Sequence, residues 1–399
     1  MLNGMHLQRY AQVLIWGLKT ARAEKYKKGD IVLVHYDLAA LPLAEVVYSQ
    51  LLDMGLNPVQ RVTLTPKMEH GFYTISNTKQ LIFNTPGDEV LFKAINGSIS
   101  LRAPDSITHL SDVRPEKIGK KAVAHKYLND ILDRREAEGK FGWTLCLYPT
   151  TELARHAGLT LEEYSDQILQ ACSLKKTDPV AWWKTIYNDA QAIKKWLNSM
   201  KVISYHIESE HVDLKVTPGH NRKWVGISGH NIPSFELFLS PDWRGTEGSF
   251  YADQPTYRSG NYVKGVRLHF KTGSVVKASA EQGEEFLIKQ IAMDNGADKL
   301  GEFSLTDKRF SKISTFMANT LYDENYGGKS GNCHVALGAS YSDTYDGDAA
   351  ELTPDKKKDL GFNDSALHWD LVNTEKKRVV AQLVSGKRVT IYEAGMFAC

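Results

Sequence analysis

Two glutamates in the C-terminal half of the chain stand in apolar surroundings, where a carboxylate is costly to bury without a partner. Glu236 lies between Phe235 and Leu237, so it has large apolar neighbours on both sides. Glu302 directly follows Gly301, and a glycine permits the close approach of another backbone segment. Considered singly, Glu236 could be a salt-bridged core acid and Glu302 an acid that caps a turn or helix.

The stretch from residue 321 to residue 341 contains a third such carboxylate, Glu324, followed by His334 in an apolar frame and by Tyr341. These polar groups need a partner if they are buried, and a metal ion would satisfy them. The structural alternatives are that His334 is a hydrogen-bonded core histidine and that Tyr341 is a packing residue. We expect this stretch to form the centre of a metal site.

A further segment contains His368 and Asp370, separated by Trp369. On a strand, residues two apart point to the same face, so these two side chains would lie together while Trp369 points to the other face. A His-x-Asp pair of this kind is a suitable pair of ligands for one ion. The alternative is a structural hydrogen-bonded pair.

The pooled chemistry is that of imidazole and carboxylate ligands without a thiolate, which favours Zn²⁺, Co²⁺ or Mn²⁺ over an iron–sulfur cluster. The candidates exceed the three or four protein ligands of one zinc site, so two ions that share a carboxylate bridge would use them. The candidate ligands are Glu236, Glu302, Glu324, His334, His368 and Asp370.

A denser group of acids and histidines occurs between residues 205 and 213. On a strand it would place His206, Glu208 and Glu210 on one face and His211 on the other. This segment lacks an apolar frame, so we interpret it as a solvated strand face and not as the metal site.

Other motifs are incomplete or absent from the sequence. Residues 327–330 resemble the end of a phosphate-binding P-loop, but Asp323 replaces its first glycine and no strand precedes it. The sequence contains no GxSxG and no HExxH. No CxxC occurs among the four cysteines, and Cys333, beside His334, is interpreted as a core filler rather than a ligand or nucleophile.

Composition limits the class of protein. The chain has 399 residues, a length that predicts two domains, with 49 basic and 47 acidic residues and a formal charge of +2. This balance argues against a nucleic-acid partner. The N-terminus has no signal-peptide pattern, and no apolar stretch is long enough to span a bilayer. The scattered cysteines favour a reducing compartment, so we expect a cytoplasmic protein without a membrane partner.

Elements that would position the site can be predicted from periodicity. Residues 1–200 predict an α/β domain with a mainly parallel sheet, beginning with a helix at 2–24, a strand at 31–36, a helix at 38–54 and a strand at 58–64. Further strands are predicted at 80–83, 89–93, 98–101 and 143–148. Residues 201–399 predict an α+β domain with a mainly antiparallel sheet that carries the metal site, with helices at 281–293 and 308–319.

The metal-site segments occur in an order that resembles the thermophilic-aminopeptidase family of metallopeptidases, peptidase family M29, over nearly the whole chain. The C-terminal matches are Asn231-Ile-Pro with Glu236; Asp294-Asn-Gly-Ala and Leu300-Gly-Glu302; Leu321-Tyr-Asp-Glu324-Asn; His334-Val-Ala-Leu-Gly with Tyr341; and Asn363, Ser365 and His368-Trp-Asp370. The N-terminal matches are Gly29-Asp-Ile-Val-Leu-Val, Tyr148-Pro-Thr-Thr-Glu-Leu-Ala, Gly158, Asp178-Pro-Val and Trp182.

The resemblance implies a metallo-aminopeptidase that acts on peptides with a free N-terminus and is a homodimer of two-domain subunits. All six candidate ligands would surround two divalent ions, with magnesium joining zinc, cobalt and manganese as a candidate. Glu302 or Glu324 would act on the attacking water, and Tyr341 would steady the tetrahedral intermediate. The rival interpretations are another two-metal hydrolase, such as a phosphoesterase or amidase, and a non-catalytic binding protein that retains the fold.

Two departures from the family pattern are expected to reshape the substrate pocket. Phe235 precedes Glu236 where the family usually has a small residue, and residues 326–331 lengthen the segment between Glu324 and His334. The native metal, the preferred N-terminal residue and the physiological peptide do not follow from the sequence.

Overall fold

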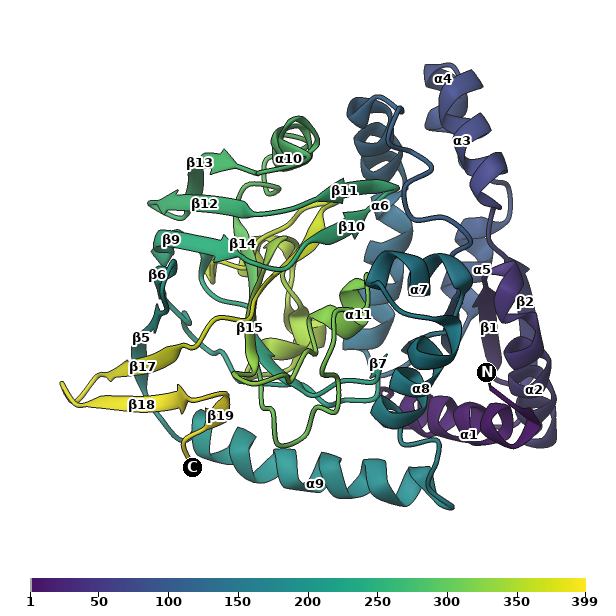
Figure 1. The fold of residues 1–399 in the computed structure, drawn as a ribbon, viewed down its shortest axis with the longest axis horizontal. Helices are drawn as coiled ribbons and strands as arrows, with labels where there is room; N and C mark the ends of the chain where they lie inside the picture. The colour runs from purple at the N-terminus through teal and green to yellow at the C-terminus, as the bar shows by residue number, and fades with distance from the viewer. Residues whose placement is uncertain (1) are drawn as a thin grey trace.

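A computed structural model describes residues 2–399 of the chain. A parallel sheet flanked by helices forms one part, and antiparallel sheets form the other (Figure 1). Both sheet types agree with the prediction from the sequence. The long helix α9 (Pro179–Asn198) runs along the lower edge of the molecule and leads from the first part into the second. No helix within residues 2–399 is both long and apolar enough to cross a membrane.

The parallel sheet has five strands in the order β2-β1-β3-β4-β7. The predicted strand–helix–strand unit at its start is confirmed, because β1 and β2 pair in parallel through the crossover helix α2. The fifth strand, β7, comes from beyond residue 200, so a segment of the C-terminal half completes this sheet. The strands are β1 (Ile31–Tyr36), β2 (Asn57–Val62), β3 (Gly97–Arg102), β4 (Gly142–Leu147) and β7 (Asn231–Ile232).

The helices of this part begin and pack as their sequences dictate. The first helix buries Tyr10, Leu14 and Leu18, whose four-residue spacing places them on one face. Thr160 and Glu163 form a capping box at the start of α8. The helices are α1 (Gly4–Thr20), η1 (Leu38–Ala40), α2 (Leu41–Asp53), α3 (Pro66–Ile75), α4 (Thr78–Leu81), α5 (Asp88–Ala94), α6 (Pro115–Ala137), α7 (Thr151–Ala157), α8 (Leu161–Ala171) and α9.

The strands predicted at residues 80–83 and 89–93 are wrong, because α4 and α5 occupy these segments. Asn77 and Gln80 form a reciprocal capping box that starts α4. In α5, Asp88 and Glu89 lie in the first turn, and Lys93 in the last turn pairs with Glu89 four residues earlier. Caps and helix-dipole charges therefore outweigh the strand-like apolar residues.

The largest antiparallel sheet has eight strands in the order β13-β12-β9-β6-β5-β17-β18-β19. The helix predicted at residues 281–293 is confirmed as α10 (Glu284–Ile291) beside β13. The strands are β5 (Val202–Glu208), β6 (Asp213–Val216), β9 (Glu247–Ala252), β12 (Val266–Lys271), β13 (Ser274–Ser279), β17 (Arg378–Leu383), β18 (Arg388–Glu393) and β19 (Met396–Phe397). A separate hairpin consists of β10 (Thr256–Arg258) and β11 (Asn261–Val263).

A second antiparallel sheet has four strands in the order β16-β15-β14-β8. Its central strands β14 and β15 are buried along their whole length, which places this sheet in the interior. The strands are β8 (Glu236–Leu239), β14 (Leu300–Thr306), β15 (Asn332–Gly338) and β16 (His368–Asn373). The short helices nearby are η2 (Trp243–Gly245), α11 (Thr320–Asp323), η3 (Ser342–Thr344), η4 (Ala349–Glu351) and α12 (Pro354–Asp359).

The helix predicted at residues 308–319 is wrong, since no helix is present in this segment. Buried Asp323 accepts hydrogen bonds from the backbone N–H groups of Met317 and Asn319, at 2.7 and 2.9 Å. Between them Ala318 has a φ of 52°, which a right-handed helix does not contain. A buried carboxylate thus takes the backbone donors that a helix would have used.

A stack of three aromatic rings joins the two parts of the molecule. Trp183 of α9 stacks on Trp16 of α1 at a centroid distance of 5.9 Å and on Phe235 at 5.4 Å. All three rings are part of one continuous hydrophobic core. Burial of such large rings stabilises the contact between α1, α9 and the start of β8, which fixes the backbone next to Glu236.

Gly301 in β14 packs against backbone, as the sequence predicted. A Cβ at this position would overlap the carbonyl oxygens of Gly338 and Ala339. We expect Gly301→Ala to lower the free energy of unfolding by about 1–3 kcal/mol, because the overlapping atoms are backbone and must shift. Urea denaturation measured with the metal-stripped protein checks this value.

Gly71→Ala is the matched control for this substitution. Gly71 lies inside α3, and only the tip of Ile75, at 3.9 Å, approaches the position of its Cβ. We expect this variant to be unchanged or more stable by about 0.5–1 kcal/mol, because alanine has the higher helix propensity. Equal stability of both variants would contradict close packing at Gly301.

Candidate metal centre

Every strand of the four-stranded sheet contributes at least one of the predicted ligands. Glu236 begins β8, Glu302 lies in β14 and His334 in β15, while His368 and Asp370 lie in β16. The strand predicted for the last pair is confirmed, with Trp369 buried on the opposite side.

The register of the strands explains why these side chains meet. His334 is paired with Ser304, and Asp370 is paired with Ala336. Glu302 lies two residues before Ser304, so both point to the same face of the sheet. The small side chains of Ser304 and Ala336 leave room for the carboxylates and imidazoles of the candidate ligands to converge.

The first cluster consists of Glu236, Glu302 and His334, all nearly fully buried. His334 Nε2 lies 3.2 Å from Glu302 Oε1 and 3.2 Å from Glu236 Oε2. The hydroxyl of Ser304 donates a hydrogen bond to the same Glu236 oxygen at 3.1 Å. Two carboxylates therefore converge on one imidazole nitrogen in the interior of the protein.

The second cluster consists of Glu302, His368 and Asp370. His368 Nε2 lies 3.5 Å from Glu302 Oε2 and 3.4 Å from Asp370 Oδ1. Its other ring nitrogen, Nδ1, lies 2.9 Å from the carbonyl oxygen of Ala339. Glu302 thus belongs to both clusters and directs one oxygen to each histidine.

Glu324 lies in neither cluster, although it lines the same cavity. It follows α11 as the residue that caps its C-terminus. Its Oε1 accepts hydrogen bonds from the side-chain amides of Asn231 at 3.1 Å and Asn325 at 3.4 Å. The structure therefore holds this carboxylate beside the clusters by two neutral donors.

Tyr341 lies at the edge of the site, with its ring 4.7 Å from that of His368 and 5.7 Å from that of Phe238. Its backbone N–H donates to the hydroxyl of Ser240 at 2.8 Å, which fixes the start of this loop. The residue is 37% exposed, and it lines the cavity. Its phenol is thus available to a molecule that enters the cavity.

Burial and mutual repulsion perturb the acids of the site. Burial raises the pKa of Glu236 to about 8, and the charges of Glu302 and Asp370 add to this effect. The pKa of Glu324 is also raised, by burial first and by the neighbouring carboxylates. Since each acid would be expensive to ionise here, a compensating positive charge is needed.

The pKa values of the two histidines are also raised, but the cause here is the neighbouring carboxylates and not burial. Burial opposes their protonation, yet Asp370 and Glu302 raise the pKa of His368 to about 9, and Glu302 and Glu236 raise that of His334 to about 9. The pKa of Asp370 is lowered to about 2 because the attraction of His368 and His334 exceeds the effect of burial.

This donor set fits divalent cations. If Nδ1 of His368 donates its proton to Ala339, a lone pair on Nε2 faces Glu302 and Asp370, which is the orientation found in metal-bound histidines. The neighbouring residue Cys333 is fully buried in β15, so it points to the face opposite His334 and cannot join the same set.

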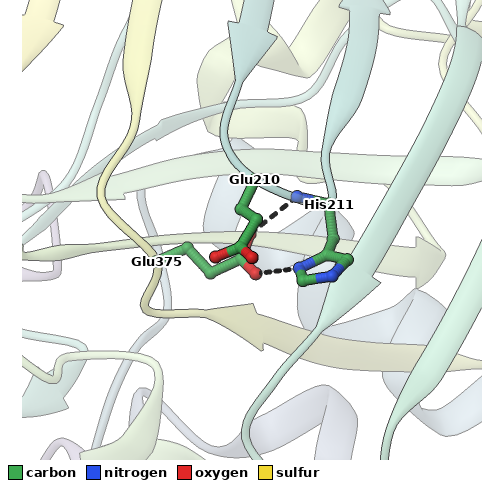
Figure 2. Close-up of side chains that lie close together, drawn as sticks. All are labelled: Glu210, His211 and Glu375. Atoms are coloured by element: carbon green, nitrogen blue, oxygen red, sulfur yellow. Dashed lines mark hydrogen bonds and ion pairs between the residues drawn. The ribbon is translucent and has the colours of Figure 1, made fainter.

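A third group of possible ligands lies apart from the sheet, at the surface: Glu210, His211 and Glu375 (Figure 2). Glu375 Oε1 lies 2.5 Å from His211 Nδ1, and its Oε2 accepts the backbone N–H of His211 and the hydroxyl of Ser209. Glu210 and His211 are exposed. Because protein donors already satisfy Glu375, we interpret this group as a set of hydrogen bonds that stabilises the turn between β5 and β6.

Sequence reasoning missed the groups that orient the acids, in particular Ser304, Asn231 and Asn325. Ser304 follows Glu302 by two residues, so strand periodicity was an available signal. Asn325 directly follows Glu324, so it was visible beside the acid in the sequence, whereas Asn231 is distant in the sequence and only the folded chain brings it to Glu324.

The effect of Phe235 and residues 326–331 on the substrate pocket stays a prediction. Neither is among the residues that line the cavity. Phe235 is fully buried and stacks on Trp183. At the start of the added residues, the carbonyl oxygen of Tyr326 accepts a hydrogen bond from the side-chain amide of Asn332 at 2.7 Å.

Comparison with known proteins shows which family the chain resembles. The model of the thermophilic metalloprotease (M29) family matches residues 4–397. Aminopeptidase PepS of Streptococcus thermophilus is 25% identical over 413 residues, covering 98% of this chain and 97% of its own. Aminopeptidase 2 of Geobacillus stearothermophilus is 30% identical over 329 residues, covering 75% of each chain.

Among solved structures, wild-type AmpT from Thermus thermophilus has the same fold. Its TM-score is 0.78 at 22% sequence identity, and the match covers 99% of each chain. The family match over nearly the whole sequence, together with the aminopeptidases among its relatives, decides the class. The chain belongs to the M29 family of thermophilic metalloproteases and is a hydrolase of the metallo-aminopeptidase type.

Proposed function

We propose that this chain removes N-terminal residues from peptides with a free N-terminus by means of two divalent ions. The observation that carries the proposal is the presence of two ligand clusters that share Glu302, since a carboxylate between two cation sites is the arrangement of a bridging ligand. The candidate ions are Zn²⁺, Co²⁺, Mg²⁺ and Mn²⁺, because the donors are imidazole nitrogens and carboxylate oxygens.

The two clusters define the ligand assignment. Glu236 and His334 would complete one ion site with Glu302, and His368 and Asp370 would complete the other. The raised pKa values of Glu236 and of both histidines support this assignment, because a cation would replace the protons that these groups otherwise hold.

Divalent cations held here would lower the pKa of a water molecule and polarise the scissile carbonyl. Glu324 is assigned as the proton acceptor, because Glu302 has both oxygens directed at histidines whereas Glu324 is held only by neutral amides. A raised pKa suits a carboxylate that receives a proton and returns it to the leaving amine. Tyr341 is assigned as the hydrogen-bond donor to the developing oxyanion.

The remaining expectations belong to the same proposal. The predicted domains at 1–200 and 201–399 would form a subunit of a cytoplasmic homodimer, with the metal site in the second domain. Exposed apolar side chains in the N-terminal part, such as Met68, Ile75 and Phe83, support a contact between the two subunits of this dimer. Three buried free cysteines are consistent with a reducing compartment.

Metal removal tests the mechanism. After EDTA stripping, we expect hydrolysis of leucyl anilide to be lost and then restored by cobalt or zinc. Restored ions should also stabilise the fold by about 2.7 kcal/mol at a concentration one hundred times the dissociation constant. Anilide hydrolysis and thermal unfolding measure the two effects. A phosphoester substrate serves as the control, and its hydrolysis in place of the anilide would overturn the proposed reaction.

Glutamine substitutions separate a bridging ligand from a proton acceptor. We expect Glu302→Gln to lose both bound metal and turnover, because the shared carboxylate is removed. Glu324→Gln should retain most of the metal and lose turnover by about 10²–10⁴-fold, the usual contribution of general acid–base catalysis. Metal content per chain and kcat measure the two effects.

Glu210→Gln, in the exposed group of Figure 2, is the control for these variants and should match the unmodified chain in both measurements. Undiminished turnover of Glu302→Gln would rule out the site assignment. Loss of metal in Glu324→Gln equal to that in Glu302→Gln would show that Glu324 is a ligand.

Tyr341→Phe tests the oxyanion donor. The substitution keeps the ring contacts with His368 and Phe238 and removes only the hydroxyl. We expect kcat to fall by about 10²–10³-fold with metal content and KM nearly unchanged, because the lost hydrogen bond forms in the transition state. A variant with full kcat would show that Tyr341 is a packing residue.

A further inference from the structure

The cavity that contains the metal-site residues has a second wall, to which both the N-terminal and the C-terminal part of the chain contribute. The cavity has a volume of about 630 Å³, which is large enough for a short peptide segment. Its second wall includes Asp133 and Glu136 of α6, Trp143 of β4, His230 just before β7, and Asp343 of η3. None of these residues has a part in the proposed hydrolysis.

The cavity is acidic to a degree that composition does not explain. The whole chain has 49 basic and 47 acidic residues, so positive side chains are not scarce. Yet the residues that line the cavity, within the described part of the chain, include seven carboxylates and neither a lysine nor an arginine. Four of the seven are the acids of the candidate metal centre, and the other three are Asp133, Glu136 and Asp343.

Glu136 is the one acid of this wall whose charge is compensated inside the protein. Its Oε1 lies 2.7 Å from His230 Nε2, and its Oε2 accepts a hydrogen bond from the indole N–H of Trp143 at 3.1 Å. Burial opposes protonation of His230, but Glu136 raises its pKa above the ordinary value. The ring of Trp143 lies 4.4 Å from that of His230, which fixes this pair in place.

Asp343 has no ion pair of this kind, although the nearby charges of His230 and Lys223 favour its ionised form. Its Oδ1 is buried and accepts no hydrogen bond from any described residue. Burial raises its pKa to about 6, so it is an anion at neutral pH. The fold thus leaves one oxygen of Asp343 without a protein donor, and this residue lines the cavity, where a donor on a bound molecule could reach its carboxylate. Asp133, on the exposed side of α6, also faces the cavity without a protein ion pair in the described residues.

The same wall offers apolar surface beside these two anions. Leu132, Phe141, Trp143 and Leu145 all line the cavity. A long aliphatic side chain with a cationic tip fits such a surface, because its methylene groups pack on apolar residues while its charge reaches a carboxylate. An acidic side chain would be repelled by the carboxylates of this wall.

We propose that this wall is a subsite for a cationic side chain, lysine or arginine, next to the scissile bond of the peptide substrate. Asp343 and Asp133 are its anionic partners, and Trp143 and Leu132 hold the aliphatic stem. The proposal rests on the aminopeptidase function proposed above, because the subsite acts on the same substrate. It concerns which peptides are cleaved and not how the bond is broken.

The test compares kcat/KM of the metal-loaded enzyme for arginyl, lysyl, leucyl and glutamyl anilides. A second series of alanyl dipeptides, with arginine, leucine or glutamate as the second residue, distinguishes binding of the N-terminal side chain from binding of the next one. We expect basic residues to be preferred over leucine by about tenfold in one of the two series, and glutamate to be the poorest in that series.

Asp343→Asn and Asp133→Asn should each reduce the ratio of arginine to leucine kcat/KM by about tenfold. Asp133 lies on an exposed helix position, so this variant is expected to fold even if Asp343→Asn is damaging. Asp133→Lys should reverse the preference toward glutamate. The matched control is Asp346→Asn, whose exposed side chain follows η3 and does not line the cavity, and it should leave the ratio unchanged.

The outcomes separate the two proposals. If leucyl substrates are cleaved but basic residues are not preferred in either series, the subsite is overturned and the aminopeptidase function stands. The subsite is likewise overturned if the preference survives in both Asp133→Asn and Asp343→Asn. If no anilide or dipeptide is cleaved at any metal loading, the proposed function itself fails.

Discussion

The repulsion between carboxylates in the interior is the constraint on which the candidate site depends. Glu236, Glu302 and Asp370 converge on two imidazoles in a buried sheet, where water cannot screen their charges. Such a set does not persist without positive charge, which here comes from protons on the histidines or from cations. The same repulsion that opposes the empty arrangement would give the site an affinity for divalent ions.

The sheet can hold this arrangement because its neighbouring positions are small and its backbone is tightly packed. Ser304 and Ala336 lie among the ligands, and Gly301 packs against the backbone after β15. A second wall of the same cavity is formed by residues of α6, β4 and η3. Chemistry and substrate choice are therefore assigned to different structural elements of one cavity.

Local signals in the sequence indicated candidate ligands, but a strand was predicted only for His368 and Asp370, in β16. His368 and Asp370 alternate with a buried Trp369, and Glu302 follows a glycine at a close backbone approach. The strands predicted at residues 80–83 and 89–93 were wrong. Capping side chains and charged residues start two helices there, and their effect outweighs the apolar pattern. The second wall could not be predicted, because packing at long range brings His230 to Glu136 and Asp343 to the cavity.

Strand β7 has a mechanical consequence for the way the two parts of the molecule are joined. It is the fifth strand of the parallel sheet, and only three residues separate it from Glu236 at the start of β8. The loop before β7 also packs tightly against α1, because the backbones of Gly229 and Gly17 approach each other closely. A swinging motion of one part against the other would pull directly on a candidate ligand. The position of Glu236 is therefore tied to the parallel sheet through β7 as well as to the four-stranded sheet that contains it.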